Sequence, residues 1–271
     1  MTLNTMKALT LNIECGKRLS EIKKYLSCKL DYDFILLQEI AGGYRYKLQY
    51  QDKDFDINHF ESHDTFVELN KVLDSNFQGY LAKSYSDSTE ENYLGNAIFI
   101  NKKYQQLKYK EILLGGNKHV DITENSHSNV GYTLQVVDIT DLSITVMNTH
   151  IIKYEADKKL ASQYFQKVKQ IADQKNRFIL GGDFNIDYTT GLFKKIFGKY
   201  KIINKAFGIK NTLNRDIHRL FMKDLHNIGL SVDNFTTSKH IYPINIAIEC
   251  DKISDHYPVT FEFKIDEQPN R

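Results

Sequence analysis

The chain has little of what marks several common protein classes. Its three cysteines, Cys15, Cys28 and Cys250, are an odd number without metal-site spacing, which argues against a disulfide framework and favours free thiols in a reducing compartment. Only three of 271 residues are proline, so no proline-rich linker divides the chain. These scarcities favour an intracellular domain without an internal linker.

Long hydrophobic runs and an excess of one charge are missing too. The segment 1–16 has no basic stretch followed by an apolar one, and no run reaches the length of a membrane span. We expect a cytoplasmic protein, although secretion without a classical signal stays open. The 36 basic and 34 acidic residues give a net charge of +2, which neither indicates nor rules out binding to nucleic acid, because a total hides local basic grooves.

Helix-like and strand-like patterns alternate along the chain. Strands are expected at 7–13, 33–38, 97–100, 132–139, 143–148, 178–180, 217–222, 244–248 and 258–265. Helices are expected at 17–30, at 65–77 with a capping box of Thr65 and Glu68, and at 155–174. This alternation predicts a single α/β domain over residues 1–271, with sheet inside and helices outside. Segments 42–64 and 79–94 are expected to be loops that set specificity.

One segment after a short apolar run carries the strongest chemical signal. Gly181 and Gly182 end that run, and Asp183 and Asn185 follow two residues apart, which puts both on one side of an extended backbone. We interpret them as groups that bind a metal ion, a water and a phosphoryl oxygen together. A Gly-Gly-Asp turn, with Asn185 capping the next segment, fits this segment alone equally well.

Polar residues also follow other apolar strands. Asn12, Glu39 and His150 stand at such strand ends, where ligands gather in sheet proteins. Near the C-terminus, Asp255 and His256 stand in a Ser-Asp-His triplet. Carboxylates without a cysteine or histidine cluster favour an oxygen-preferring cation such as Mg²⁺ over zinc.

Together these motifs resemble the endonuclease/exonuclease/phosphatase superfamily, which includes DNase I-like nucleases, neutral sphingomyelinases and inositol-polyphosphate 5-phosphatases. The matching motifs, in family order, are Leu-Asn-Ile, Leu-Gln-Glu, Gly-Asn-Ala-Ile, Asn-Thr-His, Gly-Gly-Asp-Phe-Asn and Ser-Asp-His-Tyr-Pro. The resemblance runs from Asn12 to His256. It implies an α/β (α+β) fold, a four-layered αββα sandwich of two packed mixed β-sheets flanked by helices.

The resemblance also implies divalent-metal-dependent hydrolysis of a phosphoester, with a role for each matched residue. The implied metal ligands are Glu39, Asn12 and Asp255, with Mg²⁺ as the metal and Mn²⁺ as a possible substitute. The implied catalytic residues are His150, Asp183, Asn185 and His256. The two histidines would donate to phosphoryl oxygens, and Asp183 and Asn185 would orient water and phosphate. Whether His256 or Asp183 takes the proton from water stays open.

One departure concerns the aspartate that supports the final histidine in the superfamily. The best ungapped counterpart of its Ile-Asp-x-Ile-Phe strand is 217–221, which puts His218 in the aspartate's place. Asp216 or Asp224 would substitute in another register. Glu91 is a candidate support for His150, against the alternative of a solvated loop residue.

The sequence therefore predicts a Mg²⁺-dependent phosphodiesterase that hydrolyses nucleic acid by in-line attack of water. Alternatives are a phosphomonoesterase, or a lipid phosphodiesterase of the phosphoinositide phosphatase or sphingomyelinase type. A non-catalytic scaffold that binds phosphate or protein is a further alternative, which the intact set of site residues disfavours. No obligate protein partner is evident. Base or sugar preference, endo- or exo-cleavage and oligomeric state stay open.

Overall fold

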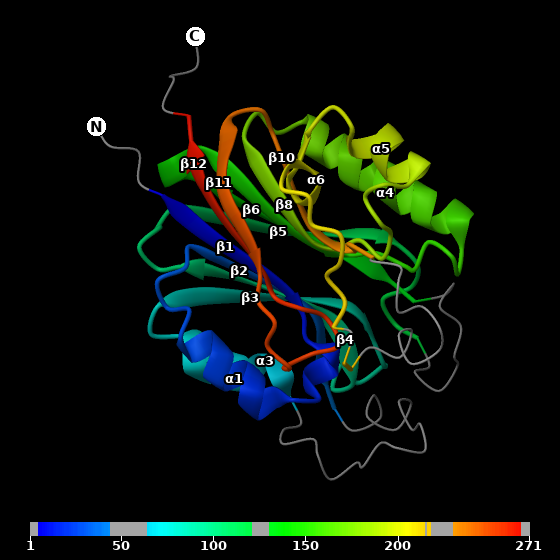
Figure 1. Ribbon diagram of the computed structural model, residues 1–271. Helices are drawn as coiled ribbons and strands as arrows, with labels where there is room; N and C mark the ends of the chain where they lie inside the picture. Colours follow the sequence, from blue (N-terminus) through cyan, green and yellow to red (C-terminus); the bar gives the residue numbers. More distant parts are fainter. Residues whose placement is uncertain (1–4, 44–63, 121–129, 215, 218–229, 267–271) are drawn as a thin grey trace.

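The computed structural model describes residues 5–43, 64–120, 130–214, 216–217 and 230–266, whose strands form two six-stranded sheets (Figure 1). Sheet A contains, in spatial order, β11 (Ile241–Ile248), β12 (Val259–Ile265), β1 (Met6–Asn12), β2 (Phe34–Gly42), β4 (Tyr93–Asn101) and β3 (Phe77–Ser86). Sheet B contains β5 (Leu107–Gly115), β6 (Tyr132–Ile139), β7 (Ile144–His150), β8 (Phe178–Asp183), β10 (Asp233–Thr237) and β9 (Lys201–Ile202).

Both sheets are mixed, because each contains one parallel pair. The parallel pairs are β1–β2 in sheet A and β7–β8 in sheet B, and the other neighbouring strands are antiparallel. In each pair the connection between the strands contains a helix, as parallel crossovers require.

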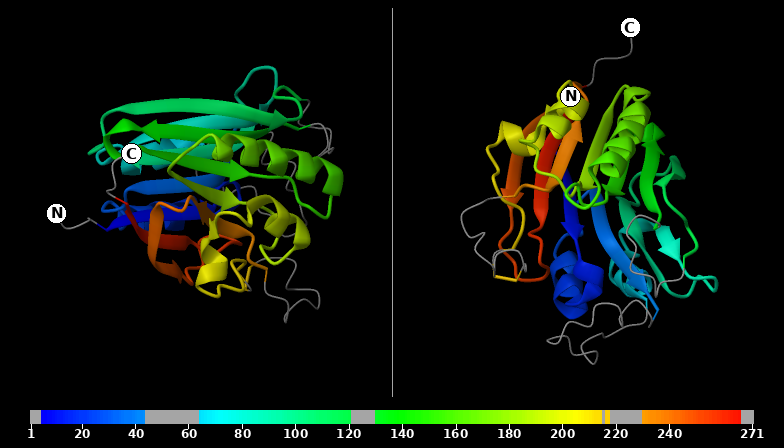
Figure 2. Two further views of the ribbon diagram at one scale, coloured as in Figure 1. Left: turned by 90° about the horizontal axis from the view of Figure 1, so that it is seen from above. Right: turned by 90° about the vertical axis from the view of Figure 1, so that its right-hand side faces the viewer.

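Helices cover the outer faces of the two sheets (Figures 1 and 2). α1 (Leu19–Ser27) and α3 (Thr65–Leu73) pack on sheet A, and α4 (Lys158–Asp173) and α5 (Gly191–Phe197) pack on sheet B. Shorter helices connect the strands: η1 (Glu14–Gly16), η3 (Thr140–Leu142) and α6 (Ile203–Ala206). The predicted four-layered α/β sandwich of two packed mixed sheets is thus confirmed. Within the described ranges, no helix is long and apolar enough to span a membrane.

The core lies in three layers that follow from strand alternation. Alternate residues of the central strands point into the space between the sheets, where Leu36 and Ile98 of sheet A pack with Val146, Ile179 and Phe235 of sheet B. The other alternate residues pack under the helices of each sheet. The strands are therefore buried on both faces, which explains their continuous hydrophobic runs.

Two predictions about segments 65–77 and 79–94 are wrong. α3 is capped by Asp64, whose side chain accepts a hydrogen bond from the Val67 amide, so Thr65 and Glu68 form no capping box. The helix ends at Leu73, and Phe77 begins β3. β3 continues to Ser86 through residues that were expected to form a loop. The expectation failed because many residues of this strand are only half-buried, which gives the segment a polar composition. The strand expected at 217–222 lies outside the described residues beyond Ile217.

Candidate active site

The inner faces of the two sheets change from apolar to polar towards one end of the sandwich. On β7, Val146 is followed on the same face by Asn148 and then His150. On β1, Thr10 and then Asn12 follow the apolar part of the strand. The ends of these strands face each other, because Asn12 contacts residues of both sheets. This change from apolar to polar residues along the strands therefore places a polar site at one end of the apolar core.

Gly181 and Gly182 allow β8 to reach this site as a strand. A Cβ at Gly181 would lie 2.6 Å from Leu36 Cδ1, so glycine lets the two sheets approach each other. Gly182 has a φ of +144°, and its Cβ would lie 2.0 Å from the Thr149 carbonyl oxygen. β8 continues through both residues to Asp183, so the alternative of a Gly-Gly-Asp turn is wrong.

Glu39 enters the site through a β-bulge. Gln38 pairs with Asn96 and Ile40 with Gly95, which leaves Glu39 as the extra residue, with a left-handed φ of 57°. A left-handed glutamate is strained and is typical of a functional position. The side chain of Glu39 is 19% exposed, so it is open to solvent and to a ligand.

Asn12 joins the two halves of the site. Its Nδ2 donates to Glu39 Oε1 at 2.9 Å and to Asp183 Oδ2 at 3.1 Å, and its Oδ1 accepts from the Glu14 amide at 3.0 Å. Two carboxylate oxygens from different sheets thus converge on one hydrogen-bond donor. Asn12 orients both carboxylates in this arrangement, and its amide would have to rotate to offer Oδ1 to a metal ion.

Asp183 is the most buried carboxylate of the predicted set, at 1% exposed. Its Oδ1 accepts from the Asn185 amide at 2.8 Å, and its Oδ2 lies 3.6 Å from His150 Nε2 and 3.8 Å from His256 Nε2. Burial alone would raise the pKa of Asp183, but the two imidazoles and the hydrogen bonds from Asn12 and Asn185 hold it below its ordinary value. Asp183 is therefore a carboxylate at neutral pH.

His150 is oriented by Asn185. The Asn185 Nδ2 donates to the Ile151 carbonyl at 3.0 Å and lies 2.8 Å from His150 Nε2. Because a carbonyl oxygen only accepts, the amide nitrogen must face Ile151, and a neutral His150 with its proton on Nδ1 would accept the second hydrogen at Nε2. Glu91 lies in the exposed turn between β3 and β4, and the polar contacts of His150 within the described chain do not include it.

His256 is 6% exposed and hydrogen-bonded to Asp233. Its Nδ1 lies 2.8 Å from Asp233 Oδ2, and its Nε2 lies 3.8 Å from Asp183 and 4.0 Å from Asp255 Oδ1. Burial alone would lower the pKa of His256, but the three carboxylates outweigh it and raise that pKa well above its ordinary value. His256 is therefore held as a charged donor that points into the site.

Asp233, which the sequence reasoning missed, holds the position expected for the supporting aspartate. Of the residues considered for it, Asp216 is exposed and pairs with Lys252 at 2.7 Å, while His218 and Asp224 lie outside the described residues. Val232-Asp233-Asn234-Phe235 has the β-branched, aspartate and aromatic order of the expected motif. This order of residues, followed by two threonines, is the sequence signal that would have identified Asp233 as the supporting aspartate.

The raised pKa of His256 predicts how stability depends on pH. A histidine whose pKa is higher in the folded than in the unfolded state stabilises the fold. This contribution is complete at pH values below the pKa of the unfolded state, about 6.5, and it is lost as pH rises through the pKa of the folded state. With chelator present, the free energy of unfolding of wild type should therefore exceed that of His256→Gln most at pH 6. This difference in free energy of unfolding should shrink towards pH 10, by about 1.4 kcal/mol for each pH unit that separates the folded-state pKa of His256 from its unfolded-state pKa. Denaturant melts across this range measure it, and a gap that grows with pH contradicts the assignment.

Two groups of side chains could hold a cation. Asp183, Asp233 and His256 offer ligand atoms within 4.8 Å of one another, but all three are buried and Asp233 is already bonded to His256. Glu39 is more open, and Asp255, 23% exposed at its side chain, follows Ser254, whose hydroxyl donates to the carbonyl of Asn12, the residue whose side chain binds Glu39. This second group consists of oxygen donors, which suits Mg²⁺ or Mn²⁺.

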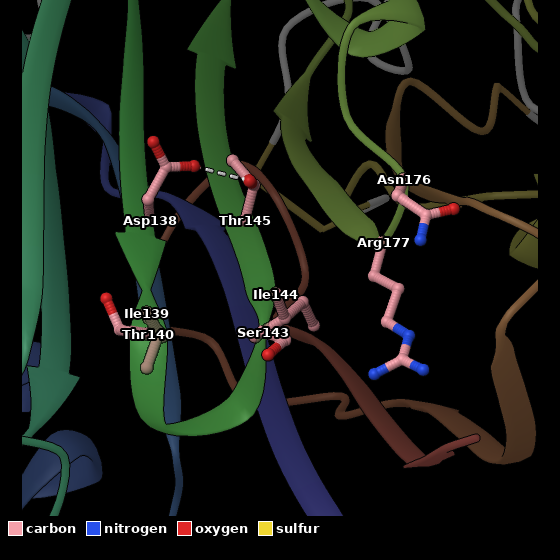
Figure 3. A pocket seen from close by; sticks show the side chains of 8 residues that line it. All are labelled: Asp138, Ile139, Thr140, Ser143, Ile144, Thr145, Asn176 and Arg177. Atoms are coloured by element: carbon pink, nitrogen blue, oxygen red, sulfur yellow. Dashed lines mark hydrogen bonds between the residues drawn. The ribbon is translucent and has the colours of Figure 1, made fainter. Parts of the chain in front are cut away.

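A separate surface pocket lies at the other end of sheet B (Figure 3). Thr145 near the start of β7 donates to Asp138 at 2.5 Å there, and Arg177 precedes β8. His150 and Asp183 end these same two strands, so the pocket is separated from the site by the full length of the strands. It takes no part in the chemistry considered below.

The sandwich, with a site of carboxylates and imidazoles at its strand ends, is the fold of DNase I-like proteins. The chain belongs to the endonuclease/exonuclease/phosphatase family, whose model, described as "Endonuclease/Exonuclease/phosphatase family", matches residues 9–256. Members of this family hydrolyse phosphoesters and generally depend on a divalent metal. No curated protein matches the chain.

Solved structures show the same fold at low identity. An endonuclease/exonuclease/phosphatase family protein from Bacteroides thetaiotaomicron is 14% identical with a TM-score of 0.71, over 99% of this chain and 98% of that one. The mannosyl-6-phosphatase of the same organism is 15% identical with a TM-score of 0.65, over 95% and 99%. The human nocturnin catalytic domain, with bound sulfate, is 15% identical with a TM-score of 0.61, over 96% and 94%.

Proposed function

We propose that residues 1–271 form one Mg²⁺-dependent phosphodiesterase domain that hydrolyses nucleic acid by in-line attack of water. The observation that carries the proposal is the contact set of Asp183. This buried carboxylate faces both imidazoles and shares the Asn12 amide with Glu39. We keep the cytoplasm as the proposed location, on the cysteine content alone.

Glu39 and Asp255 are the proposed metal ligands, and Asn12 joins them if its amide rotates. A cation of the Mg²⁺ type suits them, because both are carboxylates with partly exposed side chains and oxygen atoms are its preferred ligands. A divalent ion there supplies neutralisation of the negative charge that builds up on the phosphoryl oxygens. The tight group Asp183, Asp233 and His256 is assigned to proton handling.

The roles of the catalytic residues follow from their protonation and contacts. Asp183, ionised at neutral pH, orients the attacking water and accepts its proton as the new bond from oxygen to phosphorus forms. His256, charged and held by Asp233, donates from Nε2 to a phosphoryl oxygen. His150 and Asn185 fix the phosphoryl group from the other side. The leaving oxygen departs opposite the attacking water.

A basic and aromatic edge beside the site favours nucleic acid over smaller phosphoesters. The Tyr154 amide donates to the Asn185 carbonyl at 3.3 Å, which ties segment 151–154 to the catalytic residues. Lys153 is exposed on this segment, and Lys158, which also pairs with Glu155 at 3.3 Å, has its Nζ 5.4 Å from the Tyr154 ring centroid. Lysines beside an aromatic ring suit a polyanion that carries bases. The mannosyl-6-phosphatase relative makes a phosphomonoesterase the second candidate.

A substrate panel tests the proposal. Purified protein should cleave plasmid DNA or RNA with Mg²⁺, should lose all turnover with EDTA, and should recover when Mg²⁺ or Mn²⁺ is added in excess. Turnover of sugar phosphate, phosphoinositide or sphingomyelin should be at least ~10²-fold lower in kcat/KM, the discrimination that a site with unmatched contacts gives. Faster hydrolysis of one of these three would replace the nuclease assignment. Turnover that does not need a metal ion would contradict the assigned metal dependence, and no turnover of any of them would support a scaffold.

A further inference from the structure

A layer of buried amides lies between the two sheets, directly beneath the candidate active site. Asn148, Gln38 and Gln135 are each 0% exposed and point from their strands into the space between the sheets. Below them, in the same space, the layer of Val146, Leu36 and Ile98 is apolar. This amide layer is therefore the boundary between the core and the site.

Asn148 is the centre of this layer and contacts both sheets. Its Nδ2 lies 3.0 Å from the Leu37 carbonyl and 2.9 Å from the Ala97 carbonyl, both in sheet A. Within sheet B the same nitrogen lies 3.0 Å from Gln135 Oε1. Its Oδ1 accepts from Gln38 Nε2 at 2.8 Å, again across the gap between the sheets.

The two glutamines extend the contacts to further strands. Gln135 Nε2 donates to the Tyr80 carbonyl of β3 at 2.9 Å, and Gln38 Nε2 lies 3.1 Å from Thr10 Oγ1 of β1. The amide layer thus connects β1, β2, β3 and β4 of sheet A to β6 and β7 of sheet B. Each bond is directional, so a slide of one sheet over the other would leave several buried polar groups without partners.

The site above this layer is divided between the sheets. Glu39 and Asn12 belong to strands of sheet A, whereas His150 and Asp183 end strands of sheet B. Gln38 directly precedes Glu39, and Asn148 precedes His150 by two residues on the same face of β7. The amide layer therefore sits where it can set the distance between the site residues on sheet A and those on sheet B.

We infer that Asn148 is a positioning residue that, through Gln38 and Gln135, holds the two half-sites in register. The expected effect on kcat rests on the proposed function. Apolar packing alone would not fix the register, because hydrophobic contacts are non-directional. The register matters for catalysis, since a misplacement of about 1 Å costs on the order of 10²-fold in rate. Asn148 has no exposed surface and acts through the strands.

The test compares Asn148→Leu with Val146→Ala. Both changes lie on the same face of β7 between the sheets, and both are expected to destabilise the protein, but only the first removes bonds between the sheets. For Asn148→Leu we expect kcat to fall by about 30- to 100-fold with KM within about threefold. We expect Val146→Ala to keep kcat within about threefold at a temperature where both are folded.

Two readouts are independent of turnover. The dissociation constant for Mn²⁺, measured by titration calorimetry, should stay within about twofold in Asn148→Leu, because the proposed ligands all stand on sheet A or its loops. The ring ¹⁵N signals of His150 should shift in Asn148→Leu and stay in place in Val146→Ala. If Asn148→Leu does not fold, Gln135→Leu removes one arm of the same layer and takes its place.

Equal losses of kcat in the two variants, or unchanged His150 signals in Asn148→Leu, would overturn the inference. A wild-type protein without phosphoester turnover would instead overturn the proposed function. In that case the His150 signals still decide whether Asn148 sets the register. The two failures are therefore distinguishable.

Discussion

Replacing Asp183 with asparagine is expected to lower kcat by about 10³-fold. Asp183 is the one carboxylate of the site that contacts both imidazoles and the Asn12 amide. The amide of asparagine keeps the shape but removes the negative charge that orients water and accepts its proton, a contribution of about 10²–10⁴ in rate. Because asparagine keeps the volume and His256 keeps its bond to Asp233, we expect the thermal melting temperature to stay within a few degrees of wild type.

Asp187→Asn is the matched control for this prediction. Asp187 lies four residues further along the chain, and its carboxylate accepts from the Thr189 and Ser231 amides at 2.8 Å each, away from the imidazoles. The same substitution there should leave kcat within about threefold, as for a loop carboxylate outside the chemistry. Steady-state cleavage of DNA with Mg²⁺ measures both. Activity of Asp183→Asn within tenfold of wild type would contradict the role of Asp183.

Replacing Asp233 with asparagine is the second large effect that we expect. Asp233 is fully buried and holds His256 Nδ1 at 2.8 Å, so its loss affects both the orientation and the charge of the imidazole. We expect kcat to fall by about 10²–10⁴-fold, the range for general acid–base groups and their supports. The pKa of His256 should fall as well, because its strongest charge partner is gone.

The second prediction also states the direction in which the pH dependence of kcat should shift. If His256 acts as a charged donor, wild-type activity is lost as pH rises through its raised pKa. In Asp233→Asn the same loss should occur at lower pH, which kcat measured from pH 6 to 10 would show. Asp216→Asn, which changes an exposed carboxylate paired with Lys252, should keep the wild-type profile. An alkaline limb that does not move in Asp233→Asn would contradict the support role of Asp233.

The class of fold could be predicted because the central strands are buried on both faces. Continuous apolar runs such as 34–37 and 178–180 are typical of strands between two layers, and the apolar stripe of α4 is typical of a helix that covers a sheet. β3 and β5 were missed for the opposite reason. They are edge strands whose residues are largely half-exposed, so neither is a continuous apolar run.

The site could be predicted only as a set of residues at strand ends. The bulge at Glu39, with its left-handed backbone, depends on the pairing of β2 with β4 and leaves no local signal. The bond between Asn12 and Asp183 joins residues 171 positions apart in different sheets, so spacing does not reveal it. Asp233 was missed because its motif is degenerate and a second segment, 217–221, aligned with the expected strand without gaps, although it has His218 in the aspartate's place.

The most direct test of the account is one turnover of a short DNA in H₂¹⁸O, with Mg²⁺ and purified wild-type protein, followed by mass spectrometry. Water attack on phosphorus predicts one ¹⁸O atom in the phosphate of the product and no product when EDTA replaces Mg²⁺. A product without the label, or equal cleavage in EDTA, would contradict metal-dependent hydrolysis at this site.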